Sequence, residues 1–278
     1  MKKNAPLRPL SQAEIQPIIN ALNSGQLAMA EALSKKLLKQ FPNAFVLHNL
    51  YGNALAGQNK TKEAIEAFRK AIKIDPSIAE MHFNLAALLT NMNRHEEAIQ
   101  SYKKAVSLKP NLVDAYYNMG IAHQALKQYP LASQNYQKAI ELEPGFYEAM
   151  VNLGVVLQEQ GMLIEAINTY NQALQIHNDA QIYFNLGTAY KNQGKLGDAI
   201  AAYNKALELN PNYADVHRSV GEVLRDQGRY DESVAAYKRA LELNPDLPMA
   251  NYSLAVYLYD SGDLEGALEH FQRSQYAD

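Results

Sequence analysis

The sequence predicts an all-α solenoid of repeated helical hairpins, and three observations support this fold class. Prolines recur every 34 residues at Pro42, Pro76, Pro110 and Pro144, and after one shortened step at Asn178 the spacing resumes at Pro211 and Pro245. Within each period, apolar residues recur at intervals of three and four on both sides of a short polar break, which is the pattern of two amphipathic helices. Small and aromatic residues occupy fixed columns. Such hairpins bury their apolar faces by stacking on their neighbours.

A repeat frame that starts three residues after each of these positions aligns seven clear units. The units begin at Phe45, Ala79, Val113, Tyr147, Ala180, Ala214 and Pro248. The eighth position is always small, namely Gly52, Ala86, Gly120, Gly154, Gly187, Gly221 and Ala255. The twenty-fourth is always aromatic, namely Phe68, Tyr102, Tyr136, Tyr170, Tyr203, Tyr237 and Phe271. Small residues allow the two helices of a hairpin to approach closely, and the aromatic ring is expected to fill the space between hairpins.

The helix ends have their own signals. The break between the two helices holds Gly161, Gly194, Gly228 and Gly262, where a left-handed residue ends a helix. Residues 11–44 form a degenerate first hairpin, with Ser11 and Glu14 as a capping box and Pro42 at its end. Pro17 is expected to delay or bend its first helix, because proline has no N–H to donate. Residues 1–10 are expected to be disordered.

Composition excludes several classes of function. The formal net charge of −3 offers no basic excess for nucleic acid or a membrane surface, and the chain has no cysteine for disulfides, thiolate metal sites or cysteine catalysis. The sequence lacks a signal-peptide pattern and any apolar run long enough to span a bilayer, so we expect a soluble, cytoplasmic protein. Catalytic and phosphate-binding motifs are also missing, so the sequence predicts neither an enzyme nor a cofactor, and it predicts no metal site.

The small, aromatic and proline columns at a 34-residue period resemble the tetratricopeptide repeat over residues 45–278. This resemblance implies one continuous right-handed α-α superhelix of seven clear repeats plus the degenerate N-terminal one. It also implies a non-catalytic scaffold whose concave surface, lined by the first helix of each hairpin, binds a protein or peptide. The outward-facing positions of that helix are mainly 2, 5, 6, 9, 12 and 13.

An asparagine column stands out on this surface. Position 6 is Asn84, Asn118, Asn152 and Asn185 in four consecutive repeats. A primary amide can both donate to and accept from the backbone of an extended peptide, so these four residues are candidate peptide ligands. The column is similar to the asparagine ladder in the tetratricopeptide region of O-linked N-acetylglucosamine transferases. The alternative is that each amide bonds an adjacent helix of its own chain.

Two further columns complete the predicted site. Position 5 carries the aromatic residues Phe83, Tyr117, Phe184 and Tyr252, which either grip apolar ligand side chains or pack between repeats. Position 2 carries the acidic residues Glu80, Asp114 and Glu148, which either favour a ligand containing lysine or arginine or form a solvated face. The cations that tetratricopeptide carboxylate clamps require are missing from the first units.

The end of the sequence suggests two further possibilities. The last unit stops in an ordinary second helix without the polar cap that usually covers the end of a solenoid. We therefore expect either homo-oligomer formation through the terminal repeat surface or a longer polypeptide. In the second case, the chain is the substrate-recognition N-terminal region of a larger enzyme of glycosyltransferase, sulfotransferase or oxygenase type, truncated at residue 278.

Overall fold

A computed structural model describes residues 8–275 of the chain. Within this range the backbone forms sixteen α-helices in antiparallel pairs, which confirms the predicted all-α fold of about eight helical hairpins. The chain divides into two compact units, residues 1–143 and 144–278. No helix of the described part is long and apolar enough to cross a membrane.

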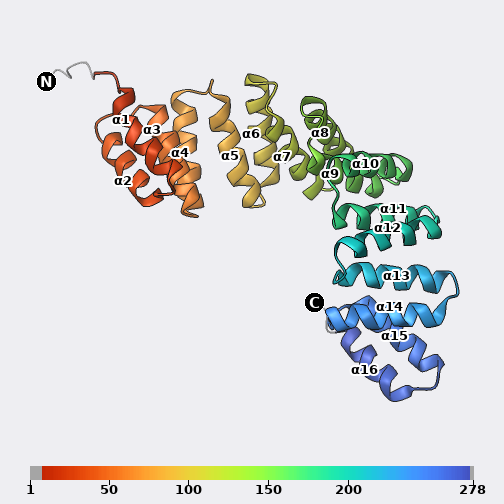
Figure 1. Cartoon of the computed structure of the whole chain (residues 1–278). Coiled ribbons are helices and arrows are strands. Elements are labelled where there is room, and N and C mark those ends of the chain that lie inside the picture. Colours follow the sequence, from red (N-terminus) through yellow and green to blue (C-terminus); the bar gives the residue numbers. More distant parts are fainter. Residues whose placement is uncertain (1–7, 276–278) are drawn as a thin grey trace. The chain divides into compact units, whose positions relative to one another are not determined.

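Unit 1 contains four hairpins, drawn from red to olive green in Figure 1. Its helices are α1 (Gln12–Asn23), α2 (Leu27–Leu38), α3 (Phe45–Gly57), α4 (Thr61–Ile74), α5 (Ala79–Asn91), α6 (His95–Leu108), α7 (Val113–Ala125) and α8 (Tyr129–Leu142). Each helix packs on the next, and the first helices α3, α5 and α7 also contact one another in sequence. The first helices therefore share one face of the unit.

Unit 2 repeats this arrangement in the green to blue part of Figure 1. Its helices are α9 (Tyr147–Glu159), α10 (Leu163–Ile176), α11 (Ala180–Asn192), α12 (Leu196–Leu209), α13 (Ala214–Asp226), α14 (Tyr230–Leu243), α15 (Pro248–Asp260) and α16 (Leu264–Gln275). The shortened step lies before α11, where Asp179 Oδ1 accepts a hydrogen bond from the backbone N–H of Gln181 at 2.7 Å. This N-cap starts α11 without the proline found elsewhere.

In five of the described hairpins the core is an aromatic ring packed on a glycine of position 8, namely Gly52, Gly120, Gly154, Gly187 and Gly221. Tyr136 and Tyr203 are fully buried. A Cβ added to Gly120 would lie 2.6 Å from Cε1 of Tyr136, and one added to Gly187 would lie 2.6 Å from the ring of Tyr203. The small residues of position 8 therefore leave room for the aromatic ring of the same repeat and for close approach of the second helix of the hairpin. Burial raises the pKa of Tyr102 in this column to about 12.

The left-handed turn residues lie where the sequence placed them. Gly161, Gly194, Gly228 and Gly262 have φ angles of 75°, 79°, 76° and 89°. In unit 1 the first hairpin has Gly25 at this position, with φ of 72°, and the other three hairpins have residues with a Cβ: Asn59, Asn93 and Lys127, at 60°, 57° and 56°. Lysine has no local side-chain bond to offset the strain of this conformation, so the turn before α8 is the least favourable of these.

The N-terminal hairpin begins earlier than its proline suggested. Helix α1 starts at Gln12 and continues through Pro17 to Asn23. Glu14 Oε2 accepts from the backbone N–H of Ser11 at 3.0 Å, and the Glu14 carboxylate also pairs with Arg8. These contacts with Arg8 and Ser11 lower the pKa of Glu14 to about 2. Of the ten residues expected to be disordered, 1–7 lie outside the described residues.

Candidate functional site

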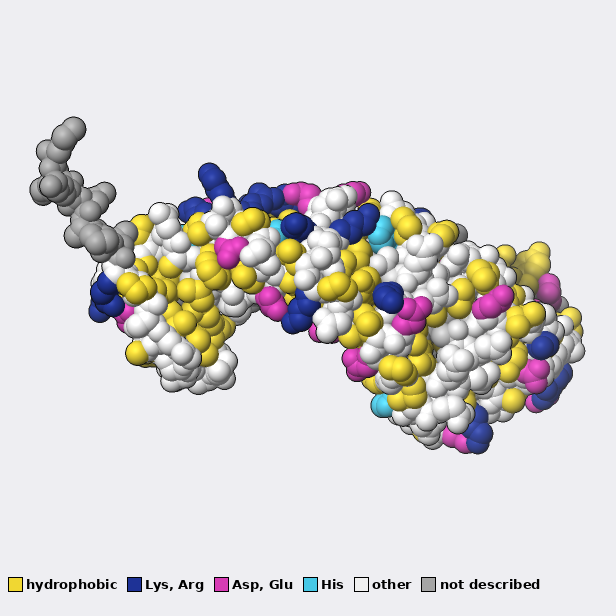
Figure 2. All heavy atoms as spheres, turned by 90° about the horizontal axis from the view of Figure 1, so that it is seen from above, with side chains coloured by type: hydrophobic (Ala, Val, Ile, Leu, Met, Phe, Trp, Pro, Cys, Tyr) yellow, Lys and Arg dark blue, Asp and Glu magenta, His cyan; other side chains and the backbone are white. Residues whose placement is uncertain are grey.

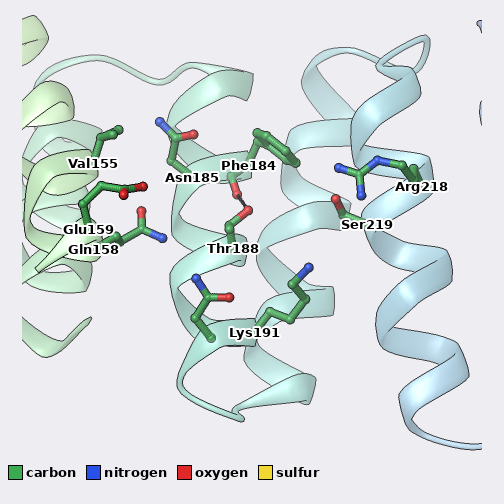
Figure 3. Close-up of a pocket in the computed structure, with 10 residues that line it drawn as sticks. Val155, Gln158, Glu159, Phe184, Asn185, Thr188, Lys191, Arg218 and Ser219 are labelled. Atoms are coloured by element: carbon green, nitrogen blue, oxygen red, sulfur yellow. Dashed lines mark hydrogen bonds between the residues drawn. The ribbon is translucent and has the colours of Figure 1, made fainter. Parts of the chain in front are cut away.

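Unit 2 contains an open groove of about 420 Å³ that crosses its first helices. We call it the α11 groove. Val155, Gln158 and Glu159 line it from α9, Phe184, Asn185, Thr188, Lys191 and Asn192 from α11, and Arg218 and Ser219 from α13. Figure 3 shows that these side chains come from three helices, which are the first helices of three successive hairpins. They occupy positions 5, 6, 9, 12 and 13 of the repeat frame, all on the face expected to bind a ligand.

Ion pairs dominate the electrostatics of this groove. Glu222 on α13 forms ion pairs with Lys191, whose Nζ lies 2.6 Å from Glu222 Oε2, and with Arg218. In Figure 3 the amine of Lys191 extends toward α13 and the guanidinium of Arg218 points back toward α11. All three side chains are largely shielded from water, which strengthens the pairing. Arg218 also lies 3.6 Å from Asp215, between Nε and Oδ1, and Glu159 lines the groove from α9, so carboxylates balance both cations.

Phe184 and Asn185 present different groups to the groove. The ring of Phe184 lies 6.0 Å from that of Tyr203 and 5.4 Å from that of Tyr213, measured between centroids. Asn185 Oδ1 accepts a hydrogen bond from Gln181 Nε2 at 3.1 Å. Its Nδ2 has no partner among the residues that the structure describes. Phe184 is therefore held in place by packing, whereas Asn185 retains a free donor.

The other asparagines of the column have different surroundings. In unit 1, Asn84 Nδ2 lies 3.4 Å from Asn49 Oδ1 and 3.3 Å from Asn53 Oδ1, so its amide bonds the preceding first helix. Asn118 on α7 is half-buried and makes no side-chain hydrogen bond within residues 8–275. Asn152 on α9 is half-buried and has a partner within the described chain. The four asparagines therefore share a frame position but differ in their hydrogen-bond partners.

The position 5 aromatics stack on the buried column of their own repeats. Phe83 lies 5.8 Å from Tyr102, and Tyr117 lies 5.9 Å from Tyr136, between ring centroids. Tyr252 in the last repeat contacts Phe271 at 5.9 Å and leaves half of its surface exposed. These rings pack internally and still present part of their surface to the first-helix face.

The acidic column is partly neutralised. Lys109 Nζ lies 3.0 Å from Glu80 Oε1, and the pKa of Glu80 is lowered by a hydrogen bond from its own backbone N–H and then by Lys109. Asp114 and Glu148 are exposed. On the face of the molecule in Figure 2, positive and negative side chains are interspersed. Glu80 therefore contributes little net negative charge to the rim.

A second repeating contact was not foreseen from sequence. At position 4, Nε2 of His48, His82 and His217 lies 2.8, 2.9 and 3.0 Å from the carbonyl oxygen of the proline six residues earlier. Asn251 makes the same contact to Pro245 at 2.8 Å. These side chains fasten the loop to the helix that follows it. Among residues 8–275, no group of three or more histidine and acidic side chains is placed to hold a metal ion.

The charged part of the groove was also missed by sequence reasoning. The named candidates came from positions 2, 5 and 6, whereas Lys191 and Gln158 occupy position 12. Position 12 does not conserve one chemistry along the chain, so no column marks it. The available signal was the 31-residue separation between Lys191 and Glu222, which places opposite charges on adjacent first helices.

Several solved structures are similar to this chain. The peptide-binding tetratricopeptide protein YrrB is 26% identical over 67% of this chain and 96% of its own, with a TM-score of 0.58. The hetero-tetramer of Cut9 and Hcn1 from the APC/C matches 90% of this chain and 49% of its own, at 25% identity and a TM-score of 0.59. A repeat protein from Cytophaga hutchinsonii shares the fold with a TM-score of 0.75 at 19% identity, over 86% of this chain and 99% of its own.

Sequence models of the repeat itself cover most of the chain. Models described as Tetratricopeptide repeat match residues 113–146, 146–212, 184–248 and 221–278, and one described as TPR repeat matches residues 52–93 and 88–127. No curated protein matches the full sequence significantly. With its paired helices, its aromatic-on-glycine core and these matches, the chain belongs to the tetratricopeptide repeat family.

Proposed function

We propose that the α11 groove binds an extended peptide segment of a partner protein, so that the chain serves as a protein–protein interaction scaffold. The observation that carries this proposal is an open groove of about 420 Å³ lined by amide, aromatic and cationic side chains. It lies on the first helices, the surface that the family uses for partners. The similarity to YrrB, a repeat protein with a peptide-binding site, supports the same reading.

The groove chemistry suggests what kind of peptide it takes. The free Nδ2 of Asn185 is suited to donate to a peptide carbonyl, as the asparagine column predicted from sequence. The ring of Phe184 offers apolar contact area beside it. Lys191 and Arg218 are each paired with a carboxylate and keep further N–H groups that can donate to peptide carbonyl oxygens.

The test is selection from a random peptide display library against the immobilised full chain, followed by affinity measurement for the selected peptides. Asn185→Ala combined with Arg218→Ala should weaken binding about tenfold or more, because two hydrogen-bonding groups are lost. The matched control is Lys205→Ala, which removes an exposed cation that pairs with Glu208 on α12. Peptides that bind the double variant as tightly as the parent would rule out this groove.

We further infer that the last hairpin has a self-association surface. Leu264 and Leu268 lie one turn apart on α16 and are 64% and 58% exposed. Light scattering on the parent and on Leu264→Glu with Leu268→Glu measures this directly. A parent that is monomeric at high concentration contradicts the inference.

A further inference from the structure

A second, smaller pocket lies near the end of unit 2, between α13, α14 and α15. We call it the α15 pocket. It has a volume of about 100 Å³ and mostly apolar walls that include Val234, Val256 and Tyr257. It shares no lining residue with the α11 groove. The backbones of α13 and α15 also approach less closely than those of α9 and α11 or of α11 and α13.

Two buried hydroxyl groups line this pocket without a hydrogen-bond partner in the described chain. Tyr237 is 2% exposed and Ser253 is 9% exposed, and neither Tyr237 Oη nor Ser253 Oγ is bonded within residues 8–275. Two other hydroxyls of the lining are already used: Ser233 Oγ donates to the carbonyl of Gly221 at 2.7 Å, and Tyr257 Oη donates to Asp231 Oδ1 at 3.3 Å. A buried polar group without a partner costs free energy, so two such hydroxyls at one pocket would gain from a ligand atom that accepts from them.

The equivalent tyrosines of earlier repeats are satisfied within the chain. Tyr136 Oη donates to Gln124 Oε1 at 2.7 Å, and Tyr170 Oη donates to Gln158 Oε1 at 2.5 Å. Both acceptors occupy position 12 of the repeat frame. In the repeat that contains Tyr237, position 12 is Arg225, and a guanidinium can only donate hydrogen bonds. The sequence change at position 12 therefore leaves the Tyr237 hydroxyl without an acceptor.

In the preceding repeat, polar contacts occupy the equivalent position between the first helices. There, Lys191 pairs with Glu222 across α11 and α13, and Tyr203 Oη lies 3.3 Å from Thr188 Oγ1. One repeat later the corresponding residues are Arg225 and Val256, so no ion pair closes the gap. Arg225 instead pairs with its neighbour Asp226, at 3.1 Å between Nη2 and Oδ1.

We propose that the α15 pocket binds a primary carboxamide, the side-chain end of a glutamine or asparagine in a partner polypeptide. A carbonyl oxygen has two lone pairs and can accept from both Tyr237 Oη and Ser253 Oγ. The amide NH₂ can donate to Asp260, which also lines the pocket. A carboxylate is disfavoured, because Asp260 would repel it and the Arg225 guanidinium is already paired with Asp226.

The size of the pocket agrees with this ligand. A cavity of about 150 Å³ holds a benzene molecule. The α15 pocket, at about 100 Å³, therefore suits a group of roughly four heavy atoms, such as a carboxamide and the adjoining methylene. A large aromatic side chain would not enter without movement of the walls.

The test uses N-acetyl-glutamine N-methylamide as the probe on the full chain, with the methyl NMR signals of Val234 and Val256 as the readout. We expect saturable shifts with this probe. The matched glutamate and norleucine probes should bind at least about fivefold more weakly. Tyr237→Phe with Ser253→Ala should weaken glutamine-probe binding about fivefold for each hydroxyl removed, equivalent to roughly 1 kcal/mol.

Two controls separate the hydroxyl contacts from general damage. Tyr203→Phe removes a hydroxyl that already contacts Thr188 and should leave probe affinity unchanged. Val256→Glu restores the residue type found at Glu222 and should abolish binding by pairing with Arg225 across the pocket. An unchanged circular dichroism melting curve establishes that each variant is folded.

The proposal is overturned by absence of saturable shifts, by equal affinity for the glutamine and norleucine probes, or by full binding to the hydroxyl-free variant. None of these outcomes depends on the α11 groove. Conversely, loss of peptide binding in the Asn185 and Arg218 variant would leave the probe result unaffected. The two proposals can therefore fail separately.

Discussion

Replacing Tyr170 or Tyr237 by phenylalanine removes one hydroxyl from the same frame position in two different surroundings. Both rings belong to the buried aromatic column of unit 2, with Tyr170 on α10 and Tyr237 on α14. Tyr170 Oη donates to Gln158, whereas Tyr237 Oη has no partner within the described residues. Both substitutions therefore convert a tyrosine ring into a phenylalanine ring, but only Tyr170→Phe removes a hydrogen bond.

The expected difference is about 1 kcal/mol. A neutral side-chain hydrogen bond contributes a net 0.5–1.5 kcal/mol, roughly, so Tyr170→Phe should lower the free energy of unfolding by about that amount. Gln158 is half-buried and can still reach water, so we add no penalty for an unpaired acceptor. Tyr237→Phe removes an unpaired buried hydroxyl and should leave the free energy of unfolding unchanged or raise it slightly.

Urea denaturation followed by circular dichroism provides the assay, with hydrogen exchange of α10 and α14 to localise the effect. Repeat proteins unfold in units stabilised mainly by neighbours, so exchange within the affected hairpin is the sharper measure. Equal destabilisation by both substitutions would refute the reasoning, because it would mean that the Tyr237 hydroxyl has a stabilising partner. A neutral Tyr170→Phe would show that the bond to Gln158 contributes nothing.

Three further predictions concern loops and caps. His82→Leu should destabilise its hairpin by about 1 kcal/mol in urea denaturation because the hydrogen bond to the Pro76 carbonyl is lost, whereas His82→Asn should be largely tolerated, since asparagine makes this contact in the last hairpin. Lys127→Gly should raise the thermal midpoint, because glycine adopts φ of 56° without the strain of roughly 1 kcal/mol that a Cβ brings; a lower midpoint would contradict this. Glu14 has a folded pKa of about 2 against an ordinary 4.5, so its stabilisation of α1 should be complete above pH 4.5 and lost as the pH falls toward 2. Hydrogen exchange in α1 should show this loss for the parent and not for Glu14→Gln.

Much of the fold could be predicted because its signals are local. The first helices from α3 onward begin at the frame residues, from Phe45 to Pro248. Helix periodicity, turn glycines and prolines each act within a few residues, and the repetition of the pattern removes ambiguity. Of the two effects predicted from Pro17, the late helix start was wrong, because the capping contacts of Glu14 and packing of the first hairpin let α1 begin at Gln12.

The candidate site was less predictable, because a column of identical residues does not fix identical contacts. Asn84 and Asn185 share a frame position, yet Asn84 bonds Asn49 and Asn53 and Asn185 bonds Gln181. The difference comes from neighbours one repeat away. Sequence reasoning could identify the face of each first helix but not the partners of each side chain.

The sequence by itself determined the period, the helical hairpins and the aromatic column, since all of these follow from spacing along one chain. Only the tertiary structure decided which polar groups are satisfied. Lys191 is paired with Glu222 in one repeat. Tyr170 donates to Gln158, whereas the equivalent Tyr237 two repeats later has no partner among the described residues. The physical reason is that hydrogen bonds and ion pairs depend on distances of about 3 Å between side chains of different helices. Those distances are set by packing, which periodicity does not encode.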